Sequence, residues 1–152
     1  MAFSVIILLY ITIGVLAAAG SIFISKNLFT AKTEQIFFAL FLIPIAGFYL
    51  AFTAYFGNDA AWQLEAGGVI VFTVLGFLGV RISFVLIAGY FLHGLWDILH
   101  EIQSHGRNDF IDVQQFTEIP MAYGVFCAVY DWCMAVYFYT RSITWRAAWS
   151  SN

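Results

Sequence analysis

Charge is scarce in this sequence. Only 10% of its 152 residues are Asp, Glu, Lys or Arg, whereas about 25% is usual in soluble domains. Hydrophobic residues make up 62% of the chain, and the mean hydropathy is +0.88. This composition excludes an ordinary soluble protein and predicts an integral membrane protein. Because a span takes about 20 residues, the chain has room for four or five spans and for no separate soluble domain.

Cysteine and histidine are also scarce. The two cysteines, Cys127 and Cys133, lie six residues apart on one expected helix, hence about 120° apart around it, and cannot form a disulfide with each other. Three histidines limit an all-histidine metal site. The sequence lacks the internal repeats and paired broken helices typical of many transporters, so it gives transport little support.

The apolar runs predict an all-α, polytopic helical bundle that forms one transmembrane domain over residues 1–152. A single helix from Ala66 to Glu101 would be about 54 Å long, against a hydrocarbon core of about 30 Å, so we expect a hairpin near Arg81. The first run lacks a basic n-region and is too long for a signal-peptide core, so we expect it to be a span. The five predicted spans are 3–25, 36–57, 66–80, 83–102 and 122–140, with polar connectors at 26–35 and 103–120 and an interfacial tail at 141–152.

The basic residues predict the orientation. Under a five-span topology five of the six share one face, with Arg107 alone opposite: Lys26, Lys32, Arg81, Arg141 and Arg146. The positive-inside rule then places the N-terminus outside and the C-terminus inside. The opposite face carries Asp59, Glu65, Glu101, Asp109, Asp112 and Glu118. Its acidic field disfavours a polyanionic partner such as nucleic acid.

One expected span carries four ionisable side chains within nine residues: His93, Asp97, His100 and Glu101. At about 100° of rotation per residue, the first three fall within roughly 60° of arc, and Glu101 widens the arc to about 100°. A charged residue at the bilayer centre costs between ~2.5 and well over 10 kcal/mol, so such residues normally face the protein interior and carry function.

The last two spans can be matched in depth. If one leaves the membrane near Ile102 and the next re-enters near Met121, His93 and Asp131 lie at similar depth. The same count places Asp97 level with Cys127, and Glu101 level with Ala122 and Tyr123. We therefore expect these two spans to build a polar pocket that opens toward the outer side.

A metal centre is the first chemistry that this pocket favours. His93, Asp97, His100 and Asp131 offer imidazole and carboxylate ligands for a divalent metal such as zinc, iron or manganese, and Glu118 is a further candidate ligand. The spacing is not the H-E-x-x-H metalloprotease signature. In an enzyme, Asp131 or Glu101 would be the catalytic general base.

Three other interpretations stay open. Acid–base work without metal could pair His93 or His100 with Asp97 or Asp131. Either histidine could be an axial ligand to a haem or chlorophyll-like pigment. The polar side chains could also form an interhelical hydrogen-bond network that fixes the bundle. For the outlying residues we expect structural roles: solvated loop groups at His105 and Glu118, a snorkelling Arg81, and interfacial Trp62, Trp145 and Trp149.

The segment from His93 to Glu101, followed by Pro120, Cys127 and Asp131, resembles a family of small bacterial integral-membrane proteins known only as a domain of unknown function. The family pattern is H-x-G-W-D-x-x-H-H, then Pro, then C-x3-D. This chain departs from it at Leu95, which separates the Gly from the Trp, and at Glu101, which replaces a histidine. The resemblance implies a shared polar site and a bacterial inner membrane, without naming an activity.

Taken together, the sequence predicts a metal-dependent membrane enzyme, a hydrolase or an oxidase, that acts on a small or lipid-like substrate. The alternative is a non-catalytic membrane subunit that binds a partner membrane protein, a lipid or a pigment. In the subunit the polar cluster would serve assembly.

Overall fold

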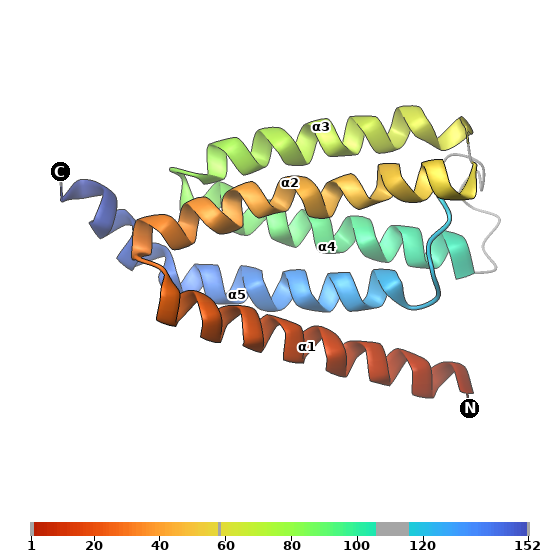
Figure 1. Ribbon diagram of the computed structural model, residues 1–152, viewed down its shortest axis with the longest axis horizontal. Helices are drawn as coiled ribbons and strands as arrows, with labels where there is room; N and C mark the ends of the chain where they lie inside the picture. Colours follow the sequence, from red (N-terminus) through yellow and green to blue (C-terminus); the bar gives the residue numbers. More distant parts are fainter. Residues whose placement is uncertain (1, 58, 106–115, 152) are drawn as a thin grey trace.

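The computed structural model describes residues 2–57, 59–105 and 116–151, and these residues contain helices and no strand. The five long helices are α1 (Ala2–Leu28), α2 (Ala31–Phe56), α3 (Trp62–Gly79), α4 (Ser83–His105) and α5 (Tyr123–Ser150), with a short 3-10 turn η1 (Asp59–Ala61) before α3. All five run along the long axis of the molecule (Figure 1).

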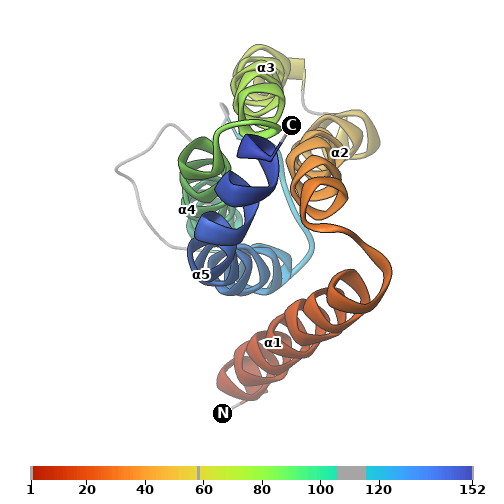
Figure 2. The ribbon, with the colours of Figure 1, turned by 90° about the vertical axis from the view of Figure 1, so that its left-hand side faces the viewer.

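Helices α2 to α5 form the body of the bundle, and α1 leans against one side of it (Figure 2). The most extensive helix contact is between α4 and α5, whereas α1 packs mainly on α5. The core between α2, α4 and α5 is apolar and aromatic, with Phe38, Leu42, Leu86, Tyr90 and Phe138 fully buried. This interior holds the middle of α4 against the middle of α5.

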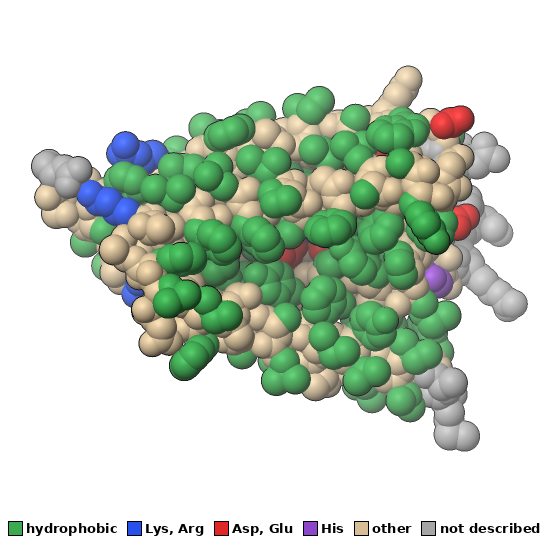
Figure 3. Space-filling view, viewed as in Figure 1, with side chains coloured by type: hydrophobic (Ala, Val, Ile, Leu, Met, Phe, Trp, Pro, Cys, Tyr) green, Lys and Arg blue, Asp and Glu red, His purple; other side chains and the backbone are tan. Residues whose placement is uncertain are grey.

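Four of the helices, α1 to α4, are long and apolar enough to cross a membrane. Large hydrophobic side chains cover much of the lateral surface of the bundle that Figure 3 shows. Among the large hydrophobic residues, Phe3, Leu16, Ile70 and Phe77 are all at least half exposed. In water this surface would be unfavourable, and in a bilayer it faces lipid. The described helices thus support a membrane protein. The predicted fifth span coincides with α5, which carries Asp131 and several tyrosines and is not among the four.

Charged side chains separate along the long axis. Lysine and arginine side chains lie at the end where α1 turns into α2, and acidic side chains lie at the other end (Figure 3). The predicted hairpin is confirmed, because α3 ends at Gly79 and α4 begins at Ser83. Arg81 therefore lies at the basic end, as expected. Arg107, Asp109 and Asp112 lie outside the described residues.

The first predicted connector is wrong. Only Phe29 and Thr30 separate α1 from α2, because the Thr30 side chain caps α2 by accepting a hydrogen bond from the N–H of Thr33 at 3.3 Å. Glu34 and its neighbour Gln35, which were predicted to belong to this polar connector, are therefore helical and buried.

The predicted interfacial role of Trp145 is wrong. Helix α5 continues to Ser150 and crosses the basic end of the bundle (Figure 2). Trp145 is completely buried and donates from Nε1 to a Glu34 carboxylate oxygen at 2.8 Å, and Trp149 donates to Gln35 at 3.0 Å. Trp145 is therefore a core residue that fastens α5 to α2, not a member of an interfacial belt. Trp62 is exposed, as expected.

The contact between α4 and α5 is unusually close at Gly124. A Cβ atom at this position would overlap the carbonyl oxygen of Asp97 and lie 2.9 Å from Cβ of Glu101. Ala122 just before it has a left-handed backbone with φ of 62°, which aims the start of α5 toward α4. A residue without a side chain is therefore required where the two helices meet.

We predict that Gly124→Ala separates α4 from α5 and lowers the free energy of unfolding by about 1–3 kcal/mol, the usual cost of overpacking a well-packed contact. Thermal unfolding in mild detergent measures the loss. Gly67→Ala is the matched control, because its Cβ would meet no atom within 4 Å. Equal melting temperatures for the two variants would contradict the close approach.

Candidate functional site

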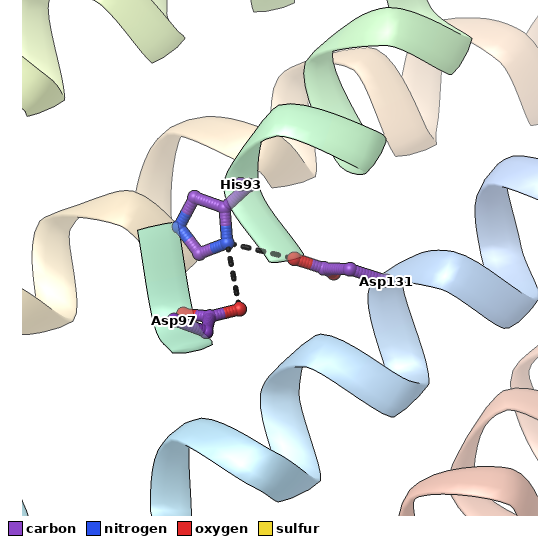
Figure 4. A group of neighbouring side chains, drawn as sticks. All are labelled: His93, Asp97 and Asp131. Carbon is purple, nitrogen blue, oxygen red and sulfur yellow. Dashed lines mark hydrogen bonds and ion pairs between the residues drawn. The ribbon is translucent and has the colours of Figure 1, made fainter. Parts of the chain in front are cut away.

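Three ionisable side chains converge in the middle of the bundle: His93 and Asp97 from α4, and Asp131 from α5 (Figure 4). Nδ1 of His93 lies 2.7 Å from Oδ2 of Asp131 and 3.3 Å from Oδ2 of Asp97. All three residues are almost inaccessible to solvent. One turn of α4 separates His93 from Asp97, which is why both reach Asp131 on the neighbouring helix.

Tyr49 of α2 completes the surroundings of this trio. Its hydroxyl donates a hydrogen bond to Oδ1 of Asp97, and its ring lies on the ring of His100, with centroids 4.0 Å apart. The sequence analysis missed Tyr49. An isolated tyrosine in the middle of an apolar span was the available signal, because a buried phenol hydroxyl usually needs a partner.

Two polar atoms of the trio lack a hydrogen-bond partner among the described residues: Nε2 of His93 and Oδ2 of Asp97. Nδ1 of His93 faces the two carboxylates, so Nε2 lies on the other side of the imidazole ring (Figure 4). Most buried polar atoms in proteins are hydrogen-bonded, so each unpartnered atom calls for an explanation of its own, such as an ion or a water molecule.

The trio has the dimensions of a metal site. One ligand atom from each of the three residues can be chosen so that all lie within 4.8 Å of one another. Metal–ligand bonds of about 2.0–2.2 Å place neighbouring ligand atoms roughly 3 Å apart, close to the spacing seen around Nδ1 of His93. Imidazole and carboxylate together suit zinc, iron or manganese.

The trio lies at the inner end of a cavity of about 480 Å³ lined by residues of α1, α2, α4 and α5. Most of the lining is apolar, with Phe41, Ile45, Phe48, Phe52 and Phe126 among its residues. Figure 3 shows acidic side-chain atoms inside a hollow between hydrophobic side chains on the long side of the molecule. The cavity is thus more apolar than the predicted polar pocket, and α1 and α2 contribute to it as well as α4 and α5.

The predicted depth matching of α4 and α5 is confirmed. His93 contacts Asp131, and Asp97 and Cys127 line the same cavity. Farther along α4, Glu101 accepts hydrogen bonds from the backbone N–H of Ala122 at 2.9 Å and from that of Gly124 at 3.1 Å. The helical period and the two membrane boundaries therefore gave the correct register.

The structure places His100 and Glu101 apart from the trio. Nε2 of His100 lies 2.8 Å from Oε1 of Glu65 on α3, and its Nδ1 lies 2.9 Å from the carbonyl oxygen of Trp96. Both oxygens of Glu101 accept backbone hydrogen bonds at the start of α5. The expected metal ligand His100 and the expected base Glu101 thus have structural partners of their own.

The remaining candidates lie toward the acidic end. Glu118 is exposed, as expected for a solvated group, and is not part of the metal-sized cluster. Nδ1 of His105 lies 3.4 Å from Oε1 of Glu101. Cys127 and Cys133 are free thiols, as the helical spacing predicted.

A comparison with protein families matches residues 9–144 to the model of a family of unknown function, DUF6010. The chain belongs to the DUF6010 family. This confirms the predicted membership of an uncharacterised family, and the match covers all of the trio and the cavity lining. No curated protein and no solved structure matches the chain.

Proposed function

We propose that this DUF6010 protein is a metal-dependent membrane enzyme that acts on a lipid-like substrate. The observation that carries the proposal is the position of the trio, three buried potential ligands at the inner end of an apolar cavity. His93, Asp97 and Asp131 would hold a divalent metal. Three protein ligands leave at least one coordination position for water or substrate, as in catalytic zinc sites.

The cavity supports a lipid-like substrate. Its phenylalanines and isoleucine offer an apolar surface for a hydrocarbon chain, and its volume of about 480 Å³ is in the range of small-molecule sites. Because α1 leans away from α2, a molecule in the bilayer could enter from the side (Figure 2). A polar group of the substrate would then reach the trio while its chain stays in the apolar part.

The metal would supply a Lewis acid that polarises a carbonyl oxygen and activates bound water. In hydrolysis, the oxygen of water adds to the acyl carbon, the bond to the leaving group breaks, and a proton from the water ends on that group. The second oxygen of Asp131 or of Asp97, the one that does not hold the metal, would accept the proton in between. With iron or manganese the same ligands would also suit oxidation by dioxygen, whereas zinc has no redox chemistry and would support the hydrolase alone.

The proposal includes the topology. With α5 as a fifth span, the basic end faces the cytoplasm, so the N-terminus lies outside and the C-terminus inside. The separation of charges along the bundle supports this orientation (Figure 3). The resemblance seen in the sequence makes a bacterial inner membrane the expected location.

Metal content tests the proposal. We expect near-stoichiometric zinc, iron or manganese by elemental mass spectrometry on protein purified in mild detergent, and loss of that metal in His93→Ala. His105→Ala is the matched control, because His105 lies near Glu101 and outside the trio. Release of fatty acid from fluorogenic acyl esters, or dioxygen uptake with a lipid, would then identify the reaction. Wild-type protein without metal, purified without chelators, would overturn the proposal.

A second candidate is a non-catalytic subunit, and one observation favours it. Tyr49, Asp97, His93 and Asp131 form a continuous series of polar contacts across α2, α4 and α5. Such a network could fix three helices without metal. In that case His93→Ala would lower the melting temperature strongly, and the wild-type protein would contain no metal.

A further inference from the structure

A second hollow, of about 380 Å³, lies at the basic end of the bundle between the start of α4 and the end of α5. Arg81 and Arg146 line its outer part, and Phe84, Ile87 and Tyr139 line the part nearer the middle of the helices. Arg146 and Tyr139 are separated by about 10 Å along α5, at ~1.5 Å per residue. The hollow therefore has a cationic end and an apolar end.

The two guanidinium groups are available to an anion. Both arginines are exposed, and no carboxylate pairs with either of them among the residues that the structure describes. The Arg81 guanidinium lies over the ring of Trp149, 4.0 Å from its centroid, and Arg146 donates from Nε to the carbonyl oxygen of Ser142 at 3.3 Å. These contacts hold the side chains in place and leave further N–H donors for a ligand.

The start of α4 adds to the positive potential. Its first turn contains no acidic side chain, so nothing there offsets the partial positive charge of the helix N-terminus. Glu34, a buried acid at this end, already pairs with Arg141 at 2.9 Å. The hollow consequently carries a net positive charge at its outer end.

The apolar part of the hollow faces outward. Phe84 is 75% exposed and Tyr139 is 73% exposed, both on the lateral surface that a bilayer would cover. A ligand that satisfies the whole hollow needs an anionic head and an apolar chain on the same side. A soluble anion would leave the apolar part empty.

We propose that this hollow binds an anionic phospholipid, with the phosphate between Arg81 and Arg146 and the first part of an acyl chain along Phe84, Ile87 and Tyr139. Arginine suits phosphate because its planar donors can form paired hydrogen bonds. The site is separate from the His93 cluster, and the proposal does not depend on the enzymatic one.

Native mass spectrometry of the protein in mild detergent tests this. Phosphatidylglycerol and phosphatidylcholine with the same acyl chains are added in equal amounts, and the bound fraction of each is measured. We expect phosphatidylglycerol to bind preferentially, and Arg81→Gln/Arg146→Gln to weaken its binding roughly tenfold or more, because both charge-assisted hydrogen bonds to the phosphate would be lost. Lys26→Gln is the control matched to a single arginine variant, because it removes one charge at the same end and its ammonium lies over the ring of Tyr137, outside the hollow. It should change binding less than twofold.

Two further measurements keep the outcome clear. If the double variant does not fold, Arg146→Gln alone is measured, because it retains the Arg81–Trp149 contact. It should still weaken the binding of phosphatidylglycerol. Glycerol 3-phosphate, which has the anion but no chains, should not displace phosphatidylglycerol at a hundredfold excess. Equal binding of the two lipids, equal loss in the lysine control, or displacement by glycerol 3-phosphate would each overturn the proposal.

Discussion

Asp131→Asn is expected to weaken metal binding at least about a hundredfold while leaving the bundle folded. Changes to residues that only support metal ligands commonly cost 10–100-fold in affinity, so the loss of a ligand's charge should cost no less. Asparagine has nearly the same shape as aspartate, and its carbonyl oxygen can still accept a hydrogen bond from Nδ1 of His93, which lies 2.7 Å from the carboxylate. Metal is lost in this variant because the negative charge is lost, not because the packing changes.

Titration of metal-free protein with Zn²⁺, Fe²⁺ and Mn²⁺ measures the affinity, and circular dichroism measures the fold. Glu118→Gln is the matched control, because it removes the charge of an exposed carboxylate outside the trio. If Asp131→Asn binds metal as tightly as this control, the trio is not the metal site. If metal binding never occurs but the variant melts at a much lower temperature, the trio is a structural network.

Glu34→Ala is expected to destabilise the protein by about 3–5 kcal/mol, because two buried donors, on Tyr137 and Trp145, each lose an acceptor at about 1–3 kcal/mol. The Glu34 carboxylate accepts hydrogen bonds from the hydroxyls of Tyr137 and Ser25, from Trp145 and from Arg141. Without it, the buried indole and phenol donors and the partly buried guanidinium lose their shared acceptor. The change therefore disconnects the end of α5 from α1 and α2.

Thermal unfolding in mild detergent should show a melting temperature lower by roughly 10 °C, since a chain of this size shifts about 2–4 °C per kcal/mol. Glu34→Gln should be intermediate, because its amide oxygen still accepts hydrogen bonds but carries no charge for Arg141. Glu118→Ala, at an exposed position, should melt within about 2 °C of the wild type. A Glu34→Ala protein as stable as Glu118→Ala would show that the hydrogen bonds to Glu34 contribute little to the free energy of unfolding.

The relation of α4 to α5 could be predicted because it depends on local rules. The helical period gives the face on which His93 and Asp97 lie, and two antiparallel spans that share a membrane boundary must match in depth. From those two facts one can predict that Asp131 lies beside His93, and the structure has this contact. The family membership followed from the same residues.

The sequence of α4 alone could not predict that His93 and His100 have different partners. His93 and His100 fall on nearly the same face of α4, but seven residues at ~1.5 Å each place them about 10 Å apart along the axis. The neighbour that each histidine contacts depends on the position of α3, where the carboxylate of Glu65 contacts Nε2 of His100. The sequence gives the face of α4 but not the position of α3 beside it.

The contacts of Glu34 with α1 and α5 could not be predicted for a related reason. Glu34 follows polar residues and resembles part of a solvated connector, while its partner Arg141 lies 107 positions farther along the chain. One local signal was present: Thr30 with Glu34 soon after it is typical of a capped helix start. That signal predicts the start of α2, although it does not predict what Glu34 binds.

The attachment of α1 mainly to α5 has a consequence for biosynthesis. Helix α1 is synthesised before α5, on which it chiefly packs, and the ribosome must add every residue from Leu28 to Tyr123 in between. At about 5–20 residues per second, this delay is on the order of ten seconds. During that time α1 lacks its main protein neighbour. Helix α5 also contributes Tyr123, Phe126 and Asp131 to the cavity, so the cavity, the trio and the attachment of α1 are completed in the same step.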